Sequence, residues 1–148
     1  MNEEYSKLRS SKEFKEWRGK HKDSFLCSYI FIDNSQFDFY NKDDTLTSFS
    51  IKDKIEVTEN QKFLKSSNKL KELSLDEIKL SQDEALELIE EKKDYHKKII
   101  ILQKTKKPFW NITLISPTGL INMKIDAVTK QILSKKVEPI SKLMKKVI

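Results

Sequence analysis

The spacing of apolar residues changes near residue 22, from a helical period to the alternation that is typical of strands. Phe14 and Trp17 lie one turn apart in a predicted helix over residues 10–21, where Ser10 and Glu13 form a candidate capping box. Beyond this helix, apolar and polar positions alternate between short turns rich in Asp and Asn. The pattern predicts three strand regions, at residues 25–32, 36–40 and 45–57.

A second predicted helix, over residues 81–95, follows a polar connector at residues 58–71. Ser81 is a strong N-cap candidate, and Glu84 stands at the capping-box position three residues later. The stripe expected to be buried consists of Ala85, Leu88, Ile89 and the stem of Lys92.

Strand alternation then returns and continues almost to the C-terminus. The residues from Ile99 to Leu102 are apolar on both faces, which predicts a central strand. The expected strands are residues 98–104, 109–115 and 120–126, and a short apolar stretch follows at 131–133. The tail has Val137, Ile140, Leu143 and Val147 at helical spacing.

Both halves of the chain therefore show one order of elements, a helix followed by three strands, which suggests an internal duplication. The predicted fold class is α+β, with two helix-plus-three-stranded antiparallel meander units packed in tandem. A unit of this size is marginal alone, so we expect the two to pack together. The predicted organisation is a unit at 1–60, a second at 72–134, and a basic tail or short helix at 135–148.

Charge divides the chain unevenly. The 148 residues carry a formal net charge of +6, yet residues 1–60 have 10 basic and 12 acidic side chains. Residues 97–148 have 12 lysines against Asp126 and Glu138. A basic region of this kind attracts polyanions, but 27 of the 29 basic residues are Lys, and Arg is the better partner for phosphates and base edges. A role with nucleic acid is therefore the alternative rather than the first hypothesis.

The residue types that carry catalysis are sparse. Cys27 alternates with aromatic residues on an apolar strand face, where a buried, unreactive thiol is expected. His21 and His96 each fall at the end of a predicted helix, where a cap that interacts with the helix dipole is expected rather than a metal ligand. With only Gly19 and Gly119, no glycine-rich phosphate loop can form. We therefore assign no catalytic or metal-ligating residue, leave the binding residues unassigned, expect no cofactor, and expect that the protein is not an enzyme.

Aromatic and charged clusters have ordinary structural interpretations as well. The acidic run at residues 83–94 is expected to be a solvated helix face. Trp17 and Trp110 are expected to be core anchors. The lysines at 104, 106 and 107 stand beside Phe109 and Trp110 and would suit a single-stranded nucleic acid, but Trp110 alternates in phase with core positions, which favours a charged turn before a core strand.

Three segments of the second half resemble a PepSY domain: Ile78–Leu88, Phe109–Leu114 and Met123–Leu133. The family pattern is a Ser-capped helix with Glu-Ala near its start, a strand opening with Trp, and a last strand ending in Asp-Ala-x-Thr-Gly. The resemblance covers about residues 78–133, and the N-terminal half would be a divergent copy. Lys130 stands where the family has Gly, and if that position needs a positive φ, lysine costs about 1 kcal/mol.

This resemblance implies a cystatin-like helix wrapped by an antiparallel sheet, and a role in binding or in regulating a peptidase. The first hypothesis is a non-catalytic PepSY-like binding or regulatory module that acts on a peptide or protein partner through a sheet edge or a helix–sheet groove. The alternative is a nucleic-acid-associated protein that uses the Lys-rich C-terminal half. The N-terminus lacks the apolar stretch of a secretory signal, and no run approaches the roughly 18 apolar residues of a membrane helix, so a cytoplasmic protein without a membrane span is expected.

Overall fold

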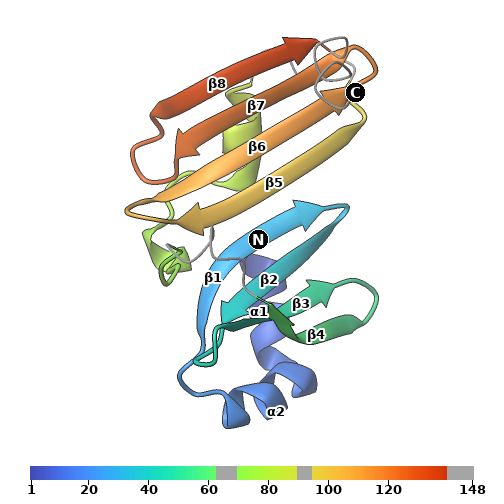
Figure 1. Ribbon diagram of the computed structural model, residues 1–148, viewed down its shortest axis with the longest axis vertical. Helices are drawn as coiled ribbons and strands as arrows, with labels where there is room; N and C mark the ends of the chain where they lie inside the picture. The colour runs from blue at the N-terminus through green and yellow to red at the C-terminus, as the bar shows by residue number, and fades with distance from the viewer. Residues whose placement is uncertain (63–69, 90–94, 140–148) are drawn as a thin grey trace.

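The computed structural model describes residues 1–62, 70–89 and 95–139. In these residues an α+β protein is built around one antiparallel sheet of eight strands, in the order β4-β3-β2-β1-β5-β6-β7-β8 (Figure 1). The helices are α1 (Asn2–Ser10), α2 (Lys12–Lys20) and α3 (Gln82–Glu87), with a short 3-10 turn at Leu75–Glu77. The strands are β1 (Phe25–Ile32), β2 (Asn34–Tyr40), β3 (Thr45–Ile51), β4 (Ile55–Lys62), β5 (Lys97–Lys104), β6 (Pro108–Ser116), β7 (Gly119–Asp126) and β8 (Ile132–Pro139).

The predicted fold class, two helix-plus-three-stranded units in tandem, is wrong, because each half supplies four strands and all eight join one sheet. The region expected to be a single strand at 45–57 is a hairpin, in which β3 turns at residues 52–54 and returns as β4. At the other edge, residues 132–139 form a full strand, so residues 135–139 are strand rather than the basic tail or short helix predicted there. Residues 140–148 lie outside the described part of the chain.

The two halves meet in the middle of the sheet, where β1 pairs antiparallel with β5. Only residues 28–31 and 100–103 form this pairing. The rest of the junction is bridged by the segment before the 3-10 turn: the Lys71 N–H donates to the Lys104 carbonyl at 2.8 Å, and the Leu73 N–H donates to the Leu26 carbonyl at 2.8 Å. One short segment thus hydrogen-bonds to a strand of each half, and the predicted central position of β5 is confirmed.

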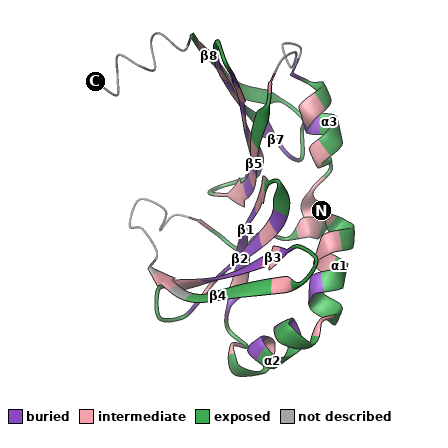
Figure 2. Ribbon diagram, turned by 90° about the vertical axis from the view of Figure 1, so that its right-hand side faces the viewer, coloured by how far each residue is buried: buried purple, intermediate pink, exposed green. Residues whose placement is uncertain are grey.

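All three helices cover the same face of the sheet, which buries the core between the two layers (Figure 2). Under α1 and α2, Trp17 and Phe14 pack with ring centroids 5.1 to 5.5 Å from Phe39 and Phe49. Under α3, the fully buried Trp110 donates its indole N–H to the Leu80 carbonyl at 2.8 Å. Both tryptophans are therefore core residues, as the sequence predicts.

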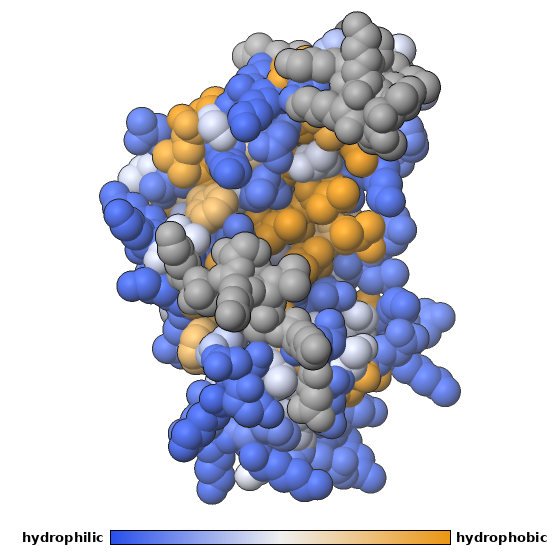
Figure 3. Space-filling model, in the orientation of Figure 1, coloured by the Kyte–Doolittle hydropathy of each residue, from blue (hydrophilic) through white to orange (hydrophobic). Residues whose placement is uncertain are grey.

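The other face of the sheet has no helix of the described residues over it, and apolar side chains gather over its middle strands (Figure 3). Strand alternation assigns to this face the half-buried residues Ile99, Ile101, Phe109, Ile115 and Leu120, which stand between fully buried positions of β5, β6 and β7. Nearer β2 the same face is polar: Asp38 is 5% exposed and accepts hydrogen bonds from Ser28, Gln36 and Ser48.

The helix starts show where local prediction worked and where it missed. The capping box of Ser81 and Glu84 is confirmed, with 3.1 Å hydrogen bonds in both directions. The N-terminal cap is one residue later than predicted: Ser11, not Ser10, accepts a hydrogen bond from the Phe14 N–H. Ser10 instead ends α1, a helix that the sequence analysis did not predict.

The helix α3, Gln82–Glu87, is shorter than the helix predicted at 81–95. The helix ends at Glu87, and residues 90–94, with Lys92, lie outside the described residues. Ala85 and Ile89 are buried as expected, whereas Leu88 is 37% exposed, so its assignment to the buried stripe is wrong.

Candidate functional site

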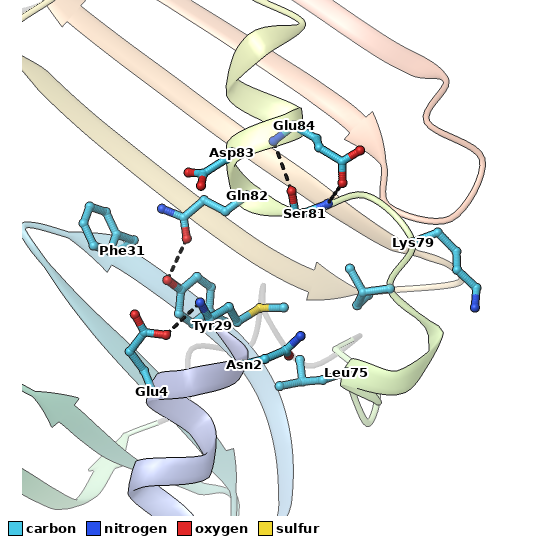
Figure 4. Close-up of a pocket in the computed structure, with 12 residues that line it drawn as sticks. Asn2, Glu4, Tyr29, Phe31, Leu75, Lys79, Ser81, Gln82, Asp83 and Glu84 are labelled. Carbon is cyan, nitrogen blue, oxygen red and sulfur yellow. Dashed lines mark hydrogen bonds and ion pairs between the residues drawn. The ribbon is translucent and has the colours of Figure 1, made fainter.

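The helical side of the protein has a hollow of about 330 Å³ over the junction of the two halves, between the first turns of α1 and α3 (Figure 4). Tyr29 of β1 reaches across its floor. The Tyr29 hydroxyl donates to the Gln82 side-chain oxygen at 2.7 Å and lies 3.1 Å from the Ser35 hydroxyl. This contact joins the N-terminal half of the sheet to the helix of the C-terminal half.

Several polar groups around this junction hollow are already engaged with one another. Glu84 closes the capping box with Ser81, and the N-terminal ammonium lies 2.7 Å from the Glu4 carboxylate. Burial raises the pKa of Tyr29, so its hydroxyl stays protonated and donates. The arrangement is that of a structural junction, in which side chains hold the halves together.

A second, larger hollow of about 510 Å³ lies between α2 and the edge strand β4, and we call it the α2–β4 groove. The wall on the α2 side includes acidic and basic side chains, and β4 contributes one apolar and one acidic side chain. The lining residues are Glu13, Glu16, Trp17, Lys20, His21, Val57 and Glu59.

Trp17 is the aromatic residue of the α2–β4 groove. Its side chain is 4% exposed and stacks on the His21 ring, with centroids 5.0 Å apart and an interplanar angle of 13°. His21 ends α2, and its Nδ1 lies 3.0 Å from the Trp17 carbonyl oxygen, so the predicted role of His21 at a helix end is confirmed. The Trp17 indole N–H is buried and has no hydrogen-bond acceptor within the described residues. A buried indole N–H usually has one.

The strand beside the groove is the end of the sheet. In the described part of the chain β4 pairs with β3 and with no other strand, so every second residue directs its N–H and C=O away from the sheet. The register shifts between Thr58 and Gln61, where β4 holds an extra residue against β3. The regular part of this edge is therefore residues 55–58, beside Val57 in the groove.

The opposite edge differs in composition. β8 presents Lys135, Lys136 and Pro139, residue types that discourage the addition of another strand. Ile132, Leu133 and Val137 of this strand are 47%, 52% and 62% exposed.

Cys27 and His96 do not form a reactive site. Cys27 is 1% exposed in β1, and its thiol donates to the Asp38 carbonyl oxygen at 3.4 Å. Burial, with a smaller effect of the Asp38 charge, raises the pKa of Cys27 to about 12. The predicted burial of this thiol is therefore confirmed, and its low reactivity stays a prediction. His96 is exposed immediately before β5, and because the described part of α3 ends at Glu87, its expected place at a helix end is not observed. Among the described residues, no group of three His, Cys, Asp or Glu side chains is placed to hold a metal ion.

The lysine cluster predicted near Trp110 lies at the turn between β5 and β6. Lys104 pairs with Glu77 at 2.9 Å, while Lys106 and Lys107 are exposed in the turn. Trp110 faces the core, so it cannot stack on a base beside these lysines. The structure thus separates the aromatic ring from the positive charge.

The α2–β4 groove escaped the sequence analysis because the region at 45–57 was interpreted as one strand. A local signal was present: the polar residues Lys52, Asp53 and Lys54 interrupt the apolar alternation between Ile51 and Ile55, as expected of a turn. Interpreting them as a turn adds a fourth strand, and β4 with it. That Trp17 would line a groove with this strand has no signal in the local sequence.

The described residues form an α+β protein with a single antiparallel sheet and one helical layer. It is similar to the crystal structure of a candidate lipoprotein from Clostridium difficile 630, with a TM-score of 0.52 and 16% sequence identity, over 85% of this chain and 90% of that chain. At this identity the likeness shows the fold alone. No family model matches the chain, and no curated protein matches it. Within the described residues, no helix combines the length and the apolarity needed to cross a bilayer.

Proposed function

We propose that this protein is a non-catalytic binding or regulatory module that takes an extended segment of a peptide or protein partner as a ninth strand on β4. The observation that carries the proposal is the position of the α2–β4 groove, directly beside the end of the sheet. Strand addition obtains affinity from main-chain hydrogen bonds and selectivity from pockets for alternate side chains. The edge and the groove offer these two components side by side.

The geometry defines how such a segment would lie. Its main chain would pair with residues 55–58, the regular part of the β4 edge. Because strand side chains alternate between the faces, every second side chain of the segment would enter the groove beside Val57 and Trp17. The open sheet face of Figure 3 offers apolar contact but no unpaired main-chain groups, so it supports strand recognition less well.

The PepSY resemblance of residues 78–133 supports the same class of role, and modulation of a peptidase would be one use of it. A partner protease presents extended chain segments, which are the form that an open strand edge recognises. A nucleic-acid role in the C-terminal half is favoured less, because Trp110 is fully buried there.

Hydrogen exchange on the full chain tests the proposal. A set of short extended peptides of differing charge is added, and protection of the β4 amides is followed by mass spectrometry. We expect at least one peptide to slow exchange in residues 55–58, because its main chain engages their outward groups. The same peptide methylated at alternate backbone nitrogens should give no protection. Binding that survives this methylation, or a whole set that leaves β4 exchange unchanged, would refute strand addition.

A further inference from the structure

The walls of the α2–β4 groove are predominantly acidic. Glu13 and Glu16 lie three residues apart on α2 and share a helix face, and Glu59 faces them from β4. Lys20 is the lysine of the lining, against these three carboxylates. We infer that the segment bound at β4 is basic, with lysine or arginine at the positions that enter the groove. This inference rests on the proposed function.

The carboxylates of this groove are available to a ligand. Glu16 has an ion pair with Lys12, but the two atoms are 3.9 Å apart and both side chains are largely exposed, so the pair holds Glu16 weakly. An extended ligand that brings ammonium or guanidinium groups to both walls would exchange this loose pairing for several charge-assisted contacts. Opposite charges on neighbouring strands stabilise pairing, and like charges oppose it.

An apolar centre lies between the acidic walls. Val57 is 37% exposed on β4, and Trp17 lines the hollow beside it. Since alternate residues of a strand share a face, the expected ligand pattern is basic, any residue, apolar, any residue, basic.

The protein's own charge distribution supplies a competing ligand. Residues 97–148 are strongly basic, and β8 presents Lys135 and Lys136 at the far edge of the sheet. A second copy of the chain that docks β8 on β4 would satisfy the same acidic groove, and such a contact would repeat without closing. The experiment must therefore separate a peptide ligand from self-association.

Three acetylated, amidated heptapeptides provide the direct test: Thr-Lys-Thr-Val-Thr-Lys-Thr and the matched forms with Gln or Glu in place of Lys. Each pattern reads identically in both directions, so the side-chain order is the same for parallel and antiparallel pairing. At low salt we expect the lysine peptide to bind about tenfold more tightly than the glutamine peptide, and the glutamate peptide to bind most weakly. The preference for lysine should diminish as salt is raised.

Matched protein variants assign this preference to the groove. The triple variant Glu13→Gln, Glu16→Gln, Glu59→Gln should remove most of the tenfold preference while the glutamine peptide binds as before. The control Glu3→Gln, Glu72→Gln, Glu87→Gln makes the same change in net charge at exposed positions outside the groove lining, and it should keep the preference. A control variant that loses the preference equally would overturn the assignment.

The outcomes distinguish this inference from the proposed function. If all three peptides protect β4 equally, strand addition stands and the basic ligand is rejected. If none protects β4, both fall. If sedimentation shows the protein self-associating at low salt, and the triple variant abolishes this association while no peptide competes with it, the occupant is a second copy and the inference is overturned.

Discussion

At the scale of single residues, the clearest strain is at Lys130. This residue has a φ of 70°, in the left-handed region that costs a side chain with a Cβ roughly 1 kcal/mol. Its N–H donates to the Asp126 carbonyl at 3.0 Å, and the Asp126 carboxylate accepts from Val128 and Thr129, so the turn holds the conformation. Position 130 therefore does have a positive φ, which is the case in which the sequence analysis expected lysine to be strained.

Replacing Lys130 by glycine should raise the free energy of unfolding by about 0.5 to 1 kcal/mol, because the strain is removed. The ion pair of Lys130 with Glu84, at 3.7 Å between exposed side chains, contributes little and offsets little of this gain. Urea denaturation measures the change. The control Lys136→Gly, at an extended β8 position, should destabilise, and a Lys130→Gly variant that is also less stable would contradict the assignment of strain.

Cys27 gives a second prediction at this scale. Because the thiol is 1% exposed and its pKa is raised to about 12, a thiol-specific disulfide reagent at pH 8 should leave the folded protein unmodified over minutes. The same reagent should label the protein fully in concentrated urea. Rapid labelling without denaturant would show that β1 opens readily or that the thiol is accessible.

The raised pKa of Cys27 also makes stability depend on pH. The protonated thiol is favoured by folding, so its contribution is complete below the ordinary value of 9.0 and is lost as pH rises towards about 12. In that window the stability of the native chain relative to a Cys27→Ala variant should fall by at most about 1.4 kcal/mol per pH unit. Comparing the two proteins cancels the titration of lysines and tyrosines. A difference that stays constant from pH 9 to 12 would rule out burial as the cause.

At the scale of elements, the junction of the halves depends on few contacts, and Tyr29 supplies one of them. Replacing Tyr29 by phenylalanine removes the hydrogen bonds to Gln82 and Ser35 and should cost about 1 to 2 kcal/mol of stability. Tyr5→Phe is the matched control, since the Tyr5 hydroxyl makes no hydrogen bond that the described residues show. Hydrogen exchange should accelerate at α3 and along β1–β5 in the Tyr29 variant, and equal costs for the two variants would show that the crossing bonds contribute nothing.

Most individual strands could be predicted from local alternation, but their assembly could not. The expected strand at 25–32 coincides with β1, and those at 98–104, 109–115 and 120–126 differ from β5, β6 and β7 by one residue at one or both ends. The pairing of residues 28–31 with 100–103 joins positions about 70 residues apart. The local sequence of either segment does not indicate that the other is its partner. The tandem arrangement was predicted because each half was assumed to form a complete sheet of its own. That assumption left one edge of β1 and one edge of β5 unpaired, and the two edges pair with each other.

Helix boundaries failed for a different reason. Ser10 and Ser11 are adjacent and equally suited to cap a helix, so the sequence does not say which of them does. The structure uses Ser11 as the cap of α2 and ends α1 at Ser10. A second helix before the cap places Leu8 fully in the core and Tyr5 over Phe37, with ring centroids 5.1 Å apart. These contacts, which are tertiary, explain why nine residues with little apolar character form a helix.

At the scale of the whole molecule, one sheet spans both halves, and this continuity predicts a single unfolding transition. The β1–β5 pairing, the bridging segment with Lys71 and Leu73, and the Tyr29–Gln82 contact all cross the junction. If the halves depended on one another only weakly, the regions predicted at 1–60 and 72–134 would unfold separately. We expect these crossing contacts to couple them, because neither four-stranded half is large enough to be more than marginally stable alone.

The two tryptophans report on this coupling, one from each half. A Trp110→Phe variant leaves Trp17 under α2 as the fluorescent probe, and a Trp17→Phe variant leaves Trp110 under α3. Each substitution lowers stability, so the comparison is made within each variant between fluorescence and far-ultraviolet circular dichroism. We expect the two urea midpoints to coincide in both variants, because loss of either half exposes the β1–β5 edge of the other. A fluorescence transition that precedes the circular dichroism transition in one variant and follows it in the other would show two independent domains, and the shared sheet would then be a docking contact rather than a common core.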